Sequence, residues 1–125
     1  MEFQNALKRV ARPLLAGVCI TGGWGSYKAP APRADLVQNA GLPQPHLLVK
    51  VNAVALMVAG AALALGIRPR EAGAVLIGCL VPTTVVGHPF WKEDAEAKDR
   101  QQIQFAKNLS TIGGLLYVVA DACSP

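Results

Sequence analysis

Charge is scarce in this sequence. Asp, Glu, Lys and Arg make up 16% of its 125 residues, whereas about 25% is usual for soluble domains. The charges gather at residues 8–12, 68–71 and 92–100 and leave long uncharged stretches between them. The net charge of +4 is not arranged as a basic stripe interleaved with aromatic residues, so we predict no nucleic-acid partner. The length allows one domain at most, which we take to be residues 1–125.

Cysteine and histidine are also scarce. Cys19, Cys79 and Cys123 lie far apart and form no Cys-x-x-Cys pair, which excludes a thioredoxin-like dithiol site and leaves no zinc-ligand spacing. His46 and His88 are the only histidines, and no carboxylate cluster accompanies them, so we expect no metal site. Because no nucleophile–base pair or cofactor motif stands out either, we expect no catalytic activity from the chain alone.

What the chain does contain is apolar sequence, in four segments at about residues 10–25, 47–67, 72–90 and 103–120. A helix needs about 20 mainly apolar residues to cross a bilayer, and the second and third segments meet this requirement. Arg12 and Lys107 intrude into the first and fourth segments, near ends where cationic side chains can reach the interface. We therefore predict an all-α fold, a four-helix transmembrane bundle with antiparallel, up-down topology. A soluble helical bundle is the alternative, since two segments fall short of the usual span length.

The connections between the segments carry turn signals. Residues 26–45 contain four prolines, so we expect an extended connection structured by turns. Gly66 can end the second helix and Pro69 can start the third, which predicts a tight turn. Opposite charges four residues apart within residues 92–102 favour a short exposed helix that leads into the fourth segment.

Polar side chains gather where one end of the bundle is expected. In an antiparallel bundle, the ends of spans one and three share a face with the starts of spans two and four. We predict a ligand-binding polar cluster on this face, centred on His88 and Asn108. His88 could donate to a quinone oxygen, bind a metal or shuttle a proton, or it could be a helix-end histidine bonded to a neighbouring backbone group or to Asn108. The predicted members are His88, Asn52, Thr84, Gln104, Asn108 and Lys107.

Two members of this cluster have simpler interpretations. Asn108 favours an interhelical hydrogen bond over chemistry, because such bonds fix helix packing in membranes. Lys107 is expected either to snorkel to the interface or to contact a headgroup or another anionic ligand.

Aromatic and charged residues mark the expected ends of the spans. Trp24, Phe90 and Trp91 are interpreted as anchors at the membrane interface. At the other end of the bundle, Asp121 follows a long apolar run and needs a cationic partner. We predict a structural ion pair of Asp121 with Arg12 or Arg70.

Basic residues also bear on orientation. Lys8 and Arg9 lie just before the first span, and basic residues close to the first span tend to stay on the cytoplasmic side. We therefore predict a cytoplasmic N-terminus.

Three stretches, taken together, resemble the DoxX family in its actinobacterial form. They are RPLLAGVCITGG, the run LVKVNAVALMVAGAALALGIRPREAGAVLIGCLVPTTVVGHPFW, and FAKNLSTIGGLLYVVAD, and they cover about Arg12 to Asp121. The resemblance implies a small four-helix protein of the bacterial inner (plasma) membrane. It also implies an accessory or scaffold role in a membrane redox complex that handles oxidative and thiol stress. The wider family often has a glutamate near the position of Leu56 or Met57, whereas this chain has only Asn52 nearby.

Three functions remain open on the sequence. The chain could be an accessory or scaffold subunit of such a redox complex. It could be a quinone-binding oxidoreductase subunit, with an apolar slot that ends at His88, Asn52 and Gln104. It could also bind a lipid or small molecule without a redox role. In each case the expected partner is the lipid bilayer, and in the first two it includes other membrane redox proteins.

Overall fold

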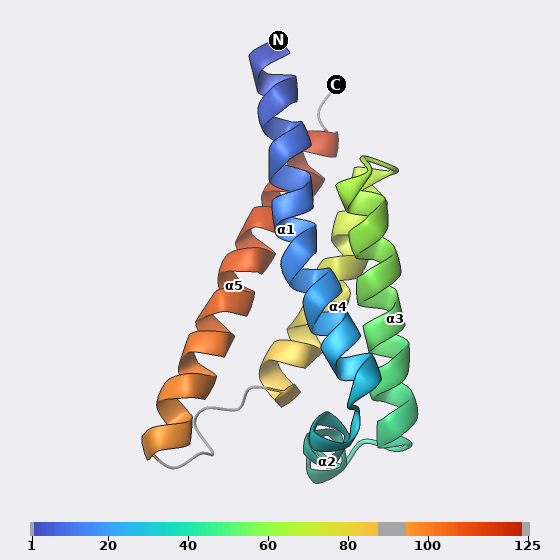
Figure 1. Ribbon diagram of the computed structural model, residues 1–125, viewed down its shortest axis with the longest axis vertical. Coiled ribbons are helices and arrows are strands. Elements are labelled where there is room, and N and C mark those ends of the chain that lie inside the picture. Colours follow the sequence, from blue (N-terminus) through green and yellow to red (C-terminus); the bar gives the residue numbers. More distant parts are fainter. Residues whose placement is uncertain (1, 88–94, 124–125) are drawn as a thin grey trace.

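The computed structural model describes residues 2–87 and 95–123, and over these residues the chain is helical with short turns and no strand. The all-α prediction is therefore confirmed for the described part of the chain. In Figure 1 the long helices lie alongside one another, a short helix covers one end of them, and both termini lie at the other end. The helices are α1 (Glu2–Lys28), α2 (Ala31–Asn39), α3 (Pro45–Ala64), α4 (Pro69–Gly87) and α5 (Ala95–Cys123).

Residues 2–87 and 95–123 contain five helices where the sequence predicted four. The additional one, α2, lies in the proline-rich connection that we expected to be extended. Pro32 stands in its first turn, where a missing backbone N–H costs nothing because that group has no intrahelical acceptor. The prolines at the start of this segment are thus compatible with a helix, and not only with an extended connection.

The outer helices α1 and α5 are longer than the predicted spans. They contain 27 and 29 residues, which corresponds to about 40 and 44 Å at 1.5 Å per residue. α5 begins at Ala95, so the described part of the charged stretch that was expected to form a short leading helix is continuous with the fourth apolar segment. Both helices therefore exceed the roughly 30 Å hydrocarbon core of a bilayer.

The turn between α3 and α4 agrees with its prediction. Gly66 has a φ of +74°, in the left-handed region that glycine enters without a Cβ penalty. The N–H of Gly66 donates to Leu63 O at 3.0 Å, and that of Ile67 donates to Ala62 O at 2.8 Å. These bonds satisfy carbonyls at the end of α3, and Pro69 then begins α4.

The helices pack through small residues around a narrow core. α1 packs chiefly on α3, and α4 on α5. A Cβ on Gly23 would lie 2.8 Å from the carbonyl oxygen of Ala53, so α1 and α3 are in backbone contact there. Close approach through small residues is typical of helices packed in membranes. The core comprises Ala16, Cys19, Leu56, Ala59, Leu63, Ala72, Leu76, Cys79, Leu80 and Leu115.

Much apolar surface points outward. Of the described helices, Pro45–Ala64 and Pro69–Val86 are long and apolar enough to cross a membrane. Only 33% and 28% of their most apolar windows are buried, whereas the core helix of a soluble protein buries most of its apolar residues. Several large apolar side chains of these helices, among them Val51, Val58 and Val85, therefore face outward.

Candidate functional site

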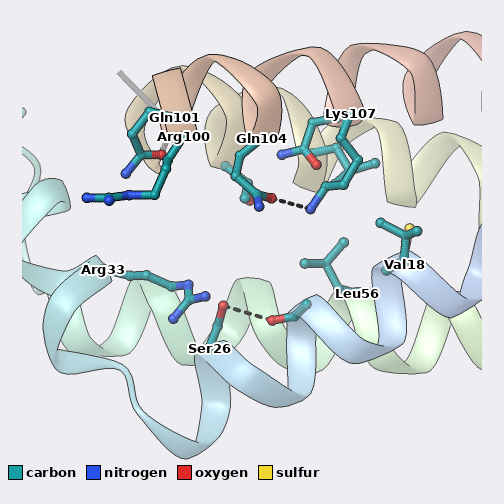
Figure 2. A pocket seen from close by; sticks show the side chains of 13 residues that line it. Val18, Ser26, Arg33, Leu56, Arg100, Gln101, Gln104 and Lys107 are labelled. Carbon is teal, nitrogen blue, oxygen red and sulfur yellow. Dashed lines mark hydrogen bonds between the residues drawn. The ribbon is translucent and has the colours of Figure 1, made fainter. Parts of the chain in front are cut away.

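A cavity of about 330 Å³ opens near the end of the molecule that carries α2 (Figure 2). α5 leans away from α1 towards this end (Figure 1), and the two helices make little contact with each other. The cavity, called the polar cavity below, occupies the space between them. Its lining is Val18, Cys19, Gly22, Ser26, Arg33, Leu56, Leu80, Thr83, Arg100, Gln101, Gln104, Lys107 and Asn108.

The polar cavity is cationic. Arg33 from α2 and Arg100 and Lys107 from α5 line it, and its described lining contains no carboxylate. Figure 2 shows Gln104 and Lys107 reaching into the space from α5, with Arg33 and Ser26 on the opposite side. The Lys107 ammonium donates to Gln104 Oε1 at 2.6 Å. This bond uses one of its three N–H donors, so two stay available to a ligand.

An apolar pocket of about 330 Å³ adjoins the polar cavity. The two spaces share Ser26, Arg33 and Thr83 as lining residues. Its other lining residues come from α2, α3, α4 and the segment after α2, and all but one of them are apolar. They are Val37, Leu42, Leu48, Val49, Asn52, Pro82 and Val86.

The structure brings together half of the polar cluster predicted from the sequence. Gln104, Lys107 and Asn108 all line the polar cavity. They lie within about one turn of α5, which is why their spacing could be read from the sequence. His88, the predicted centre, lies outside the described residues.

The other two predicted members lie elsewhere. Asn52 lines the apolar pocket and donates through Nδ2 to Thr83 Oγ1 at 2.8 Å, which links α3 to α4. Thr84 is buried and donates to the carbonyl of Leu80 at 2.6 Å. Threonine in a helix commonly bonds back to its own preceding turn in this way, so Thr84 faces neither space.

The interhelical hydrogen bond predicted for Asn108 is made by Asn52 instead. Asn108 is only 3% exposed, and within the described part of the chain its side chain has no hydrogen-bond partner. No completely enclosed polar side-chain atom among those residues lacks a partner, so the Asn108 amide keeps access to the cavity that it lines.

Arg33 and Ser26 are site residues that the sequence analysis missed. Arg33 was missed because its segment was expected to be extended, whereas α2 places its side chain at the polar cavity beside Ser26 (Figure 2). Ser26 is buried and donates to Gly22 O at 3.0 Å. Its only sequence signal was its four-residue spacing from Gly22, which places both on the same face of α1.

Aromatic residues cluster at the same end of α1. Trp24 is exposed and stacks with Tyr27 at a centroid separation of 6.4 Å. The ammonium groups of Lys28 and Lys50 lie 6.0 Å from the Trp24 and Tyr27 ring centroids, respectively. This arrangement has the composition of an interfacial anchor. Phe90 and Trp91, the other predicted anchors, lie outside the described residues.

At the opposite end, Asp121 pairs with a residue that we did not predict. Its carboxylate lies 3.0 Å from Lys8 Nζ, so Lys8 takes the place predicted for Arg12 or Arg70. Arg12, one turn further along α1, lines the same open cavity between α1 and α5 as Lys8 and Asp121. Because both side chains of the pair remain partly exposed, its contribution to stability is expected to be at most about 1 kcal/mol.

Comparison with known families assigns the chain. The DoxX family model matches residues 7–89, more than half of the sequence. The chain belongs to the DoxX family. The match runs from α1 to the end of α4 and stops before α5. The lining residues Gln104, Lys107 and Asn108 of the polar cavity therefore lie on a helix outside the matched region. No curated protein and no solved structure matches the sequence.

Proposed function

We propose that this DoxX protein is a multi-pass protein of the bacterial plasma membrane that holds a small molecule taken from the bilayer, as an accessory subunit of a membrane redox complex. The observation that carries the proposal is the polar cavity, which adjoins an apolar pocket at one end of strongly apolar helices. Sites that bind small molecules are mostly apolar with a few placed polar groups, and the paired spaces have this composition.

The proposed membrane position extends to all four long helices. α3 and α4 are long and apolar enough to span. The outer helices also expose large apolar side chains, among them Leu7 and Leu14 on α1 and Leu109 and Leu116 on α5. The basic residues near the start of α1 favour a cytoplasmic N-terminus. In this orientation the polar cavity opens on the extracytoplasmic side, because both termini lie at the other end (Figure 1).

The redox part of the proposal comes from the family resemblance. Family members take part in membrane redox complexes, and the chain resembles them along the stretches quoted above. A quinone is the second candidate for the bound molecule. The observation in its favour is the apolar pocket, which is lined by valine and leucine and contains the polar side chain of Asn52.

The proposal is tested by purifying the protein in mild detergent and identifying co-purified proteins, quinones and lipids by mass spectrometry. Leu48→Trp is expected to fill the apolar pocket that Leu48 lines and to abolish the retained small molecule. Leu47→Trp is the matched control, because Leu47 is exposed and lines neither space. Wild type and Leu47→Trp should retain one bilayer molecule per chain.

The same experiment tests the accessory role. All three proteins should retain the same redox partner, since each substitution changes only one side chain near the start of α3. Recovery of the wild type with no bilayer molecule would refute the binding function. Recovery with no redox protein would refute the accessory role.

A further inference from the structure

The positive charge of the polar cavity is not balanced by a carboxylate among its described lining residues. Among the described residues, neither Arg33 nor Lys107 has a carboxylate partner, whereas Lys8 pairs with Asp121 and Arg68 with Glu71. Both unpaired cations line the polar cavity, as does Arg100. Cationic side chains at membrane depth are costly unless an anion or an aqueous cavity accompanies them. The missing counter-charge is therefore expected from a ligand.

Asn108 supplies an independent indication of a ligand. It is 3% exposed, lines the polar cavity and has no hydrogen-bond partner among the described residues. Buried polar side chains nearly always have a partner, and a side-chain amide can donate two hydrogen bonds. Arg33 and Lys107 provide charge, and Asn108 provides buried donors, so the three together match an oxyanion with several acceptor atoms.

The adjoining space determines what kind of oxyanion fits. Ser26, Arg33 and Thr83 form a boundary shared by the polar cavity and the apolar pocket. Beyond this boundary the lining consists of valine, leucine and proline, with Asn52 as the exception. The Asn52 amide already donates to Thr83, which leaves this pocket suited to hydrocarbon. A ligand that occupies both spaces has a charged group at one end and an apolar chain at the other.

We propose that the polar cavity binds the oxyanion headgroup of an anionic amphiphile, such as the phosphate of an anionic lipid, while its acyl chain enters the apolar pocket. This inference rests on the proposed binding of a bilayer molecule and specifies its chemical class. Arg33 and Lys107 hold the headgroup charge, and Asn108 donates to its oxygens. The ligand enters from the bilayer leaflet that faces α2.

The test is equilibrium binding of short-chain phosphatidylglycerol to the full chain purified in a zwitterionic detergent. The double variant Arg33→Gln/Lys107→Gln should weaken binding by about tenfold or more, because charge-assisted hydrogen bonds are the strong ones. Arg68→Gln/Arg70→Gln is the matched control. It removes the same charge from exposed positions at the turn between α3 and α4 and should change the affinity by no more than about twofold. Lys107→Arg keeps the charge and should retain binding, which shows that replacing the Lys107 side chain does not by itself abolish binding.

Two further ligands separate the possible sources of the oxyanion. Phosphatidylcholine should bind at least about tenfold more weakly than phosphatidylglycerol, since its headgroup has no net charge for the cations to neutralise. Millimolar inorganic phosphate should not displace phosphatidylglycerol, because it cannot fill the apolar pocket. Displacement by phosphate would replace the amphiphile with a free ion and overturn the proposal.

The remaining outcomes also decide the matter. Equal affinity of the double variant and the wild type, or equal binding of the two lipids, would overturn the headgroup assignment. If the double variant still co-purifies with a neutral lipid or quinone that Leu48→Trp loses, the proposed binding function stands and the anionic class is wrong. If no bilayer molecule binds the wild type at all, both proposals fail.

Discussion

Val58→Asp is expected to cause a severe loss of folded protein from the membrane. Val58 lies on α3 and is 64% exposed. If this face contacts lipid, a carboxylate there costs about 3 kcal/mol relative to valine, close to the value for the centre of a spanning helix. The yield of folded monomer extracted from membranes and its thermal stability in detergent should both fall sharply.

The size of this effect separates a membrane protein from a soluble bundle. At an exposed position of a soluble helix, the same change would alter stability by about 0.5 kcal/mol or less. Gln38→Asp is the control, because Gln38 is exposed on α2 and outside the candidate spans. We expect wild-type yield from Gln38→Asp. Equal behaviour of the two variants would show that the outer face of α3 does not contact lipid.

Gly23→Ala is expected to destabilise the packing of α1 on α3 by about 1–3 kcal/mol, as overpacking typically does. The new Cβ would lie 2.8 Å from Ala53 O and 2.9 Å from Met57 Cγ. Because the nearest atom belongs to the backbone, the helices must separate to relieve the contact. Thermal unfolding in detergent, followed by circular dichroism, measures the loss.

Gly25→Ala is the matched control for this prediction. It lies two residues away on the same helix, and a Cβ there meets no atom within 4 Å. Alanine is a better helix former than glycine by about 1 kcal/mol, so Gly25→Ala should be neutral or stabilising. A Gly23→Ala protein as stable as Gly25→Ala would mean that α1 and α3 are not in backbone contact.

The apolar helices and their turn could be predicted because local sequence determines them. Long uncharged runs rich in Ala and Leu require α3 and α4, and Gly66 and Pro69 separate these helices for stereochemical reasons. α2 could not be predicted in the same way. Its prolines are compatible either with a break or with a first helical turn, and only tertiary contact with α3 and α4 selects the helix.

The candidate site was predicted where its residues share one helix and missed where they do not. Gln104, Lys107 and Asn108 are neighbours on α5, so their joint position follows from helix geometry. Arg33 lies on α2, and it reaches the same cavity only because α2 is placed beside it in the folded protein. Lys8 and Arg12 illustrate a smaller error, since they are four residues apart and occupy the same face of α1. For the Arg12 alternative, the predicted partner of Asp121 thus lay on the correct face of α1 but one turn away, whereas the Arg70 alternative lies on α4.

The most direct test of the account is whether α2 and the C-terminal end of α5 lie on opposite sides of a membrane. Cys123 is exposed, and Cys19 and Cys79 are buried, so Cys123 serves as a natural reporter for a membrane-impermeant maleimide. Ala40→Cys, placed just after α2 in a Cys123→Ser background, reports on the other end. In intact cells we expect labelling at position 40, and labelling of Cys123 only after permeabilisation. The reverse pattern would overturn the proposed orientation alone, whereas labelling of both positions from one side would contradict the membrane-spanning arrangement.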